Sequence, residues 1–157
     1  MNSRAEISRI EDQLRRSMEG PAWVGPCVLD LLKEVPVDLA PAKPLEHAHS
    51  IWEIVLHIAA WQRTAARRLQ GETVELSPAE DWPPVPDVSE AAWKQAIKNL
   101  RESYEALKKS IAKLGDDKLL ATKVPNREHD YYFLLHGIVQ HNFYHAGQIG
   151  VLKKSSR

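Results

Sequence analysis

The sequence has a single cysteine, Cys27, among its 157 residues, so no disulfide can form within the chain. A lone thiol is typical of a reducing compartment, and we expect a cytoplasmic location. There is no charge excess either, because 21 Lys and Arg residues balance 21 Asp and Glu residues. Nucleic-acid binders usually present a basic face, so we expect no nucleic-acid partner. No segment approaches the roughly 18 apolar residues of a membrane span, and the first residues lack the apolar core of a signal peptide. We therefore expect a soluble protein without a membrane partner.

The remaining composition, 43% hydrophobic and 27% charged, suits one folded domain over residues 1–157. We find no convincing strand and no internal repeat. Apolar residues at helical spacing predict helices over residues 3–18, 50–70, 89–114 and 130–154, and a shorter helical piece over 28–34 extends the first arm. Ser3 and Glu6 have the spacing of a capping box at the start of the first helix. The pattern predicts an all-α protein, a four-helix bundle.

The segment 71–88 separates the second and third predicted helices and carries four prolines. Extended, it can span up to about 60 Å, more than the roughly 32 Å length of the second helix. The helices on either side therefore need not be antiparallel neighbours. Long loops of this kind inside a domain are often functional.

Polar residues interrupt two of the predicted inward faces. The last helix places His141, His145 and Gln148 in a stripe with leucine and isoleucine, and the 50–70 helix places His57 among aliphatic residues. Burying such a group without a partner typically costs about 1–3 kcal/mol. Some partner must therefore satisfy these side chains.

A metal ion is the partner that we favour. His141 and His145 are four residues apart, so both can face one ion. His57 lies near the middle of its helix, as they do, and packed helices are only about 8–10 Å apart. Three imidazoles with one open position are typical of catalytic zinc sites, and zinc, nickel and iron(II) all suit such ligands.

Other candidates carry less weight. Glu53 lies one turn before His57, so it could orient that ring, carry a proton, or be a surface charge. Glu46 and His49 resemble half of a di-iron motif, but the sequence has no second copy. His136 should point away from the predicted site, because five residues before His141 correspond to about 140° around a helix.

Three stretches resemble the DinB/YfiT-like family of metalloenzymes: GPAWVGPCVLDLLKEVP (20–36), SIWEIVLHIAAWQ (50–62) and HNFYHAGQIGVLKK (141–154). The resemblance implies a four-helix bundle in up-down-down-up order, with the Pro-rich segment as a crossover between helices 2 and 3. It carries the metal ligands onto His57, His141 and His145. Members include enzymes that use low-molecular-weight thiols and others assigned as metal-dependent hydrolases, and dimers are common. The resemblance therefore implies a homodimer that acts on a small molecule.

Two classes of function remain open. The first is an enzyme whose divalent metal activates a water or a low-molecular-weight thiol, as in a hydrolase or in a thiol S-transferase acting in detoxification. Arg63, Arg67 or Arg127 could then hold a carboxylate of the thiol cofactor. The alternative is a non-catalytic metal- or ligand-binding bundle that serves as a dimeric interaction or sensor module.

Overall fold

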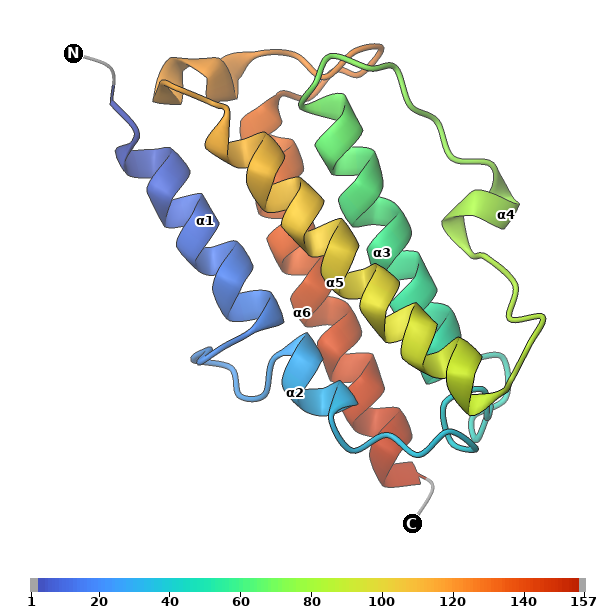
Figure 1. Cartoon of the computed structure of the whole chain (residues 1–157). Coiled ribbons are helices and arrows are strands. Elements are labelled where there is room, and N and C mark those ends of the chain that lie inside the picture. The colour runs from blue at the N-terminus through green and yellow to red at the C-terminus, as the bar shows by residue number, and fades with distance from the viewer. Residues whose placement is uncertain (1–2, 156–157) are drawn as a thin grey trace.

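The protein is built from helices. The computed structural model describes residues 3–155, and four long helices dominate this range: α1 (Ala5–Met18), α3 (Ile51–Arg68), α5 (Glu90–Ala112) and α6 (Tyr131–Ser155) (Figure 1). Two short helices, α2 (Val28–Leu32) and α4 (Pro78–Asp81), and a 3₁₀ helix, η1 (Asp117–Ala121), lie in the connections. No strand occurs within the described residues. The prediction of an all-helical fold is confirmed.

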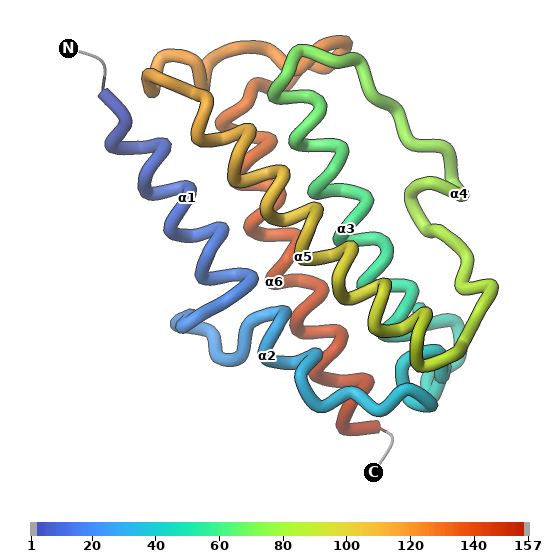
Figure 2. The backbone as a smooth tube through the Cα atoms, viewed as in Figure 1, coloured from blue at the N-terminus to red at the C-terminus, as the bar shows by residue number. Residues whose placement is uncertain are grey.

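The long helices lie side by side, and Figure 2 shows their directions. α3 and α5 run the same way, whereas α1 and α6 run the opposite way. The segment between α3 and α5 returns along the outside of the molecule and carries α4. α3 packs against both α5 and α6, and α6 also contacts α1 and α2. The α3–α6 contact brings the two histidine-bearing helices together.

The start of α1 differs from the sequence prediction. The N-cap residue is Arg4, and the expected capping box of Ser3 and Glu6 does not form. The carboxylate of Asp117, in η1, instead accepts hydrogen bonds from the backbone N–H groups of Glu6 at 3.1 Å and Ile7 at 2.9 Å. The prediction was wrong because a carboxylate distant in sequence takes the place of the local hydroxyl. The hydroxyl of Ser3 donates to the same carboxylate.

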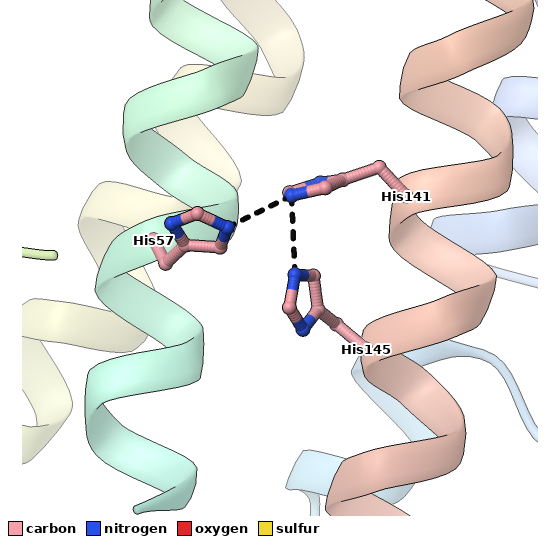
Figure 3. A group of neighbouring side chains, drawn as sticks. All are labelled: His57, His141 and His145. Carbon is pink, nitrogen blue, oxygen red and sulfur yellow. Dashed lines mark hydrogen bonds between the residues drawn. The ribbon is translucent and has the colours of Figure 1, made fainter. Parts of the chain in front are cut away.

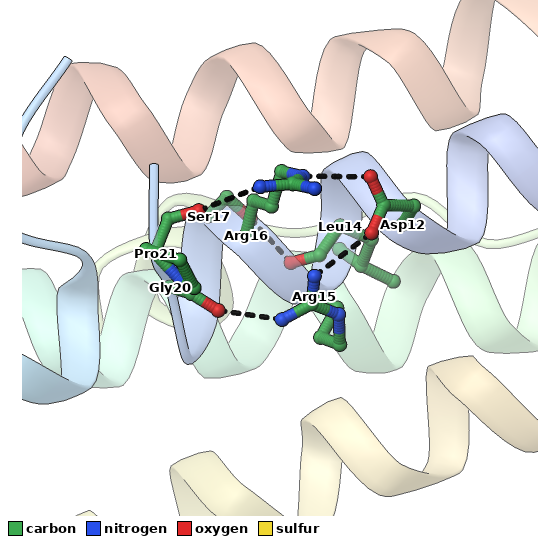
Figure 4. Close-up of polar contacts among 7 residues, drawn as sticks. All are labelled: Asp12, Leu14, Arg15, Arg16, Ser17, Gly20 and Pro21. Atoms are coloured by element: carbon green, nitrogen blue, oxygen red, sulfur yellow. Dashed lines mark hydrogen bonds and ion pairs between the residues drawn. The ribbon is translucent and has the colours of Figure 1, made fainter. Parts of the chain in front are cut away.

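The end of α1 is stabilised by arginines that reach forward into the next turn (Figure 4). Arg15 and Arg16 both pair with Asp12, at 2.8 and 2.6 Å. They also donate to the carbonyl oxygens of Gly20 and Pro21, respectively. Gly20 has a φ of +74°, a left-handed conformation that favours glycine. These contacts fix the turn that leads to α2.

Within residues 3–155, no helix combines the length and the apolar character that crossing a bilayer requires.

Candidate metal centre

The sequence around α3 positions His57. Ser50 is the N-cap and accepts a hydrogen bond from the N–H of Glu53 at 3.1 Å, while the Glu53 carboxylate accepts from the N–H of Ser50 at 2.7 Å. This capping box fixes where the helix begins. His57 then falls on the face toward α6 and is only 5% exposed.

The three predicted imidazoles meet between α3 and α6 (Figure 3). Nε2 of His141 lies 2.9 Å from Nε2 of His57 and 3.1 Å from Nε2 of His145. The ligand atoms of the three rings all lie within 4.8 Å of one another. His145 is 4% exposed, and His141 is partly exposed. The structure thus brings together the three side chains that the sequence selected.

The outer nitrogens of two rings are anchored. Nδ1 of His57 lies 2.7 Å from the backbone carbonyl oxygen of Asp81, and Nδ1 of His145 lies 2.6 Å from the amide oxygen Oε1 of Gln148. Both oxygens are acceptors, so each Nδ1 must carry the proton. In a neutral ring, Nε2 then carries the lone pair. Two lone pairs therefore point into the cluster, which is the arrangement that metal-bound histidines adopt.

The surroundings keep the rings neutral. Burial, together with the neighbouring His145 and His57, lowers the pKa of His141 to about 3. Burial likewise lowers the pKa of His145 to about 4, against an opposing effect of the Gln148 hydrogen bond. The pKa of His57 is also lowered, mainly by burial. All three rings are neutral at pH 7 and can act as ligands.

Hydrogen bonding within the cluster is incomplete without a cation. A proton on Nε2 of His141 would have to serve two acceptors, and Nδ1 of His141 is buried with no partner among the described residues. A proton on Nδ1 instead would leave three lone pairs facing one another. One divalent ion would satisfy all three. Nitrogens on a tetrahedral zinc are about 3.3 Å apart, close to the two shorter separations here.

The crossing segment 71–88 covers the site. The Trp82 indole stacks on the ring of His57 at 3.8 Å with an interplanar angle of 4°. His49 stacks on the other face of Trp82 at 3.5 Å. Nε1 of Trp61 donates to the Asp81 carboxylate at 2.7 Å, which ties α4 to α3. The segment therefore shields His57 from water and holds its Nδ1 acceptor.

Glu53 does not take the role of orienting His57. Its carboxylate is engaged with the N–H of Ser50, with Lys43 at 3.0 Å and with His49 at 3.5 Å. The carboxylate beside His57 is that of Asp81, at 3.1 Å from Nδ1. The spacing of one turn between Glu53 and His57 did not predict this arrangement, because the backbone N–H at the start of α3 binds the Glu53 carboxylate.

The other candidates lie outside the cluster. His136 faces α1, where its Nε2 is 3.8 Å from the Glu6 carboxylate. Cys27 is a buried free thiol that contacts Asp30. Arg63 is exposed, Arg67 pairs with Glu72 at 2.8 Å, and Arg127 pairs with Glu75 at 3.1 Å.

Sequence reasoning missed the contributions of Asp81 and Trp82. A signal was present: Ser77 and Glu80 have capping-box spacing around Pro78, and together they start the short helix α4. That signal predicts a helix in the segment but not the face on which the segment lies. Arg68, which is 4% exposed, was also overlooked beside its exposed neighbour Arg67.

Comparison with known proteins agrees with this geometry. No curated protein and no solved structure gives a significant match to the chain. The family model described as the DinB superfamily matches residues 27–149, a span that includes all three histidines and the segment that covers them. The match extends over more than half of the chain and confirms the resemblance found in the sequence. The chain therefore belongs to the DinB superfamily.

Proposed function

We propose that the protein is a metal-dependent enzyme in which His57, His141 and His145 hold one divalent cation and leave a position open for a small molecule. The observation that supports this most strongly is the convergence of three Nε2 atoms while two outer nitrogens are anchored by oxygen acceptors. A protein core gains nothing from neutral imidazoles arranged with their lone pairs inward. A bound cation would lower the pKa of a water or thiol at its open position.

Other groups of the protein would orient the ligands, exclude water and leave a path for the substrate. The Asp81 carbonyl and the Gln148 amide hold two rings in the tautomer that binds metal. The stacked Trp82 excludes water from one side of the site. His141 is the residue of the three that is partly exposed, and it lines a cavity, so substrate would approach from its side.

Between water and a low-molecular-weight thiol, we favour the thiol. Hydrolysis benefits from a general base beside the attacking water. Among the described residues, the group of potential ligands contains three histidines and no carboxylate. The Asp81 carboxylate lies beside Nδ1, on the outer side of His57. A thiol needs less help, because its ordinary pKa is already about 8.5. The reaction proposed is transfer of the whole thiolate to an electrophilic carbon of a small molecule: the thiol loses its proton, a C–S bond forms, and the bond between that carbon and its leaving group breaks.

Metal analysis tests the site. We expect the purified protein to contain about one equivalent of zinc, nickel or iron, and His141→Ala to lose it. His136→Gln is the matched control, since His136 lies on the same helix but faces Glu6. Equal metal content in wild type and His141→Ala would refute the assignment.

Cobalt substitution separates the enzyme from the alternative of a closed, non-catalytic module. The visible spectrum of Co²⁺ reports its ligands. Adding 2-mercaptoethanol should change the spectrum if a coordination position is open to thiols. A spectrum that thiol leaves unchanged would refute the thiol mechanism and favour a structural or sensory metal.

The assembly is also a proposal. We propose a homodimer that forms through the outer face of α6, where Phe133, Tyr144 and Val151 are 66%, 66% and 57% exposed. Large apolar side chains gathered on one exposed helix face mark interaction sites.

We further propose a single domain with the up-down-down-up order of the DinB-like bundle, in which residues 71–88 form the crossover. The free thiol of Cys27 supports a cytoplasmic location.

A further inference from the structure

A cavity of about 330 Å³ adjoins the histidine cluster at the end of α3. His141 lines it, and so do Trp61, Phe133, Leu134 and Ile138, which make most of its wall apolar. Its volume lies at the lower end of the range for small-molecule pockets, about 300–1,000 Å³. The cavity is therefore large enough for a small organic ligand beside His141.

Two guanidinium groups line the same cavity, and no Asp or Glu does so among the described residues. Arg68 is only 4% exposed. Among the described residues, its guanidinium contacts a backbone carbonyl oxygen, that of Val74 at 2.8 Å, and the ring of Trp61 at 5.6 Å. Neither contact carries a negative charge, and the Glu75 carboxylate, which pairs directly with Arg127, acts on Arg68 only through its electrostatic field. A buried cation without an anionic partner is costly, and buried charges are normally paired.

Arg127 adds a second positive charge at the rim. Its side chain is 33% exposed and pairs with Glu75, a residue that is itself largely exposed. Burial and the neighbouring charge of Arg127 lower the pKa of the Arg68 guanidinium, against an opposing effect of the Glu75 carboxylate. Two like charges facing one cavity favour an anion between them.

We propose that this cavity binds the carboxylate of a small organic acid, with Arg68 and Arg127 on the carboxylate and the apolar body against Trp61 and Phe133. The planar guanidinium matches a carboxylate in two parallel hydrogen bonds. A phosphate offers similar hydrogen bonds, but the mostly apolar wall favours a monoanion with an apolar body. The inference rests on the proposed function, since it names the class of substrate or thiol that would lie beside the metal.

Trp61 connects the two parts of the site. Its ring lies 6.2 Å from that of His141, and the Arg68 guanidinium carbon lies 5.6 Å from the indole. One indole thus contacts both the histidine cluster and the proposed anion site. A molecule held at its carboxylate by Arg68 would place its other end toward His141.

Binding of phenylacetate to the protein as purified, followed by NMR titration, tests the proposal. We expect saturable changes in chemical shift, including that of the Trp61 indole signal. The Trp61→Phe variant identifies this signal, because the variant lacks it. Arg68→Gln and Arg127→Gln should each weaken binding roughly tenfold or more, because a hydrogen bond to a charged group is lost. Arg67→Gln is the matched control: it removes the same charge one residue away and should bind within about twofold of wild type.

Three outcomes would overturn the proposal. One is equal affinity of wild type, Arg68→Gln and Arg127→Gln, as expected if the carboxylate binds the metal alone. The second is equal affinity for the neutral analogue 2-phenylethanol. The third is inorganic phosphate binding as tightly as phenylacetate, which would make this a phosphate site. Because Arg127 is at the rim, its variant keeps the test valid should Arg68→Gln fail to fold.

Metal content of the same samples separates the two proposals. Arginine-dependent binding of phenylacetate by a protein without metal would support the anion site and refute the metal assignment. Bound metal without arginine-dependent binding of phenylacetate would support the metal assignment and refute the anion site.

Discussion

The hydrogen bond between His145 and Gln148 provides the sharpest test of the metal centre. Gln148→Leu removes the acceptor that holds Nδ1 of His145, at 2.6 Å, and keeps a side chain of similar size. Nδ1 then loses the acceptor that it has among residues 3–155, and the ring can change tautomer and point its proton into the cluster. We expect weaker metal binding with little change in fold.

The magnitude follows from the role of such outer contacts. Removing the hydrogen-bond partner of a metal-bound histidine typically lowers metal affinity about 10- to 100-fold. This corresponds to about 1.4–2.7 kcal/mol. Asp81→Ala should cost less, although it too changes a residue that contacts a ligand. The strongest contact of His57 is with the backbone carbonyl of Asp81, at 2.7 Å, which the substitution retains.

Competition with a chromophoric zinc chelator measures these affinities. Gln140→Leu is the matched control, because Gln140 is an exposed residue of the same type on the same helix. A dissociation constant for Gln148→Leu within twofold of the control would refute the reasoning. So would a larger loss for Asp81→Ala than for Gln148→Leu.

Three further predictions concern stability and assembly. Asp117→Ala removes the acceptor for two N–H groups of α1 and should lower the free energy of unfolding by about 1–2 kcal/mol in urea, whereas Ser3→Ala should cost less than about 0.5 kcal/mol. The metal-free protein should lose stability as the pH falls from about 6.5 toward 4. In that range the histidines of the unfolded chain take up protons. His141 and His145 in the folded protein do not, because their pKa values are lowered to about 3 and about 4. Urea midpoints measured against pH check this, and a flat profile would contradict it. Tyr144→Glu should convert the proposed dimer to a monomer in analytical ultracentrifugation, since the exposed ring would be replaced by a charge. Unchanged sedimentation of this variant would place the interface elsewhere or show that no dimer forms.

Much of the scaffold could be predicted from periodicity alone. The stripe that begins at Trp93 and ends at Leu114 predicts a long helix, and α5 occupies most of that range with nearly all of the stripe buried. The pairing of His141 with His145 could also be predicted, because residues one turn apart share a helix face. His57 was expected to join them because it too lies near the middle of its helix and packed helices are only about 8–10 Å apart. Such patterns are local, so they can be read along one element at a time.

Contacts between distant segments could not be read in this way. Asp117 caps α1 from more than 100 residues away, and Asp81 approaches His57 from the crossing segment. Glu53 was a reasonable candidate by spacing, but its own helix start uses its carboxylate. In the first two cases two acceptors compete for one donor, and in the third two donors compete for the Glu53 carboxylate. Only the positions of these groups in space decide which pair forms.

The sequence by itself determined the helices, the family and the three imidazoles that face the interior, because each depends on residue types at fixed spacing. Only the tertiary structure decided which groups surround those imidazoles: the Asp81 carbonyl, the Trp82 ring and the buried Arg68. The physical reason is that helical periodicity specifies a direction around one axis. Distance between side chains on different elements depends on how the loops bring those axes together.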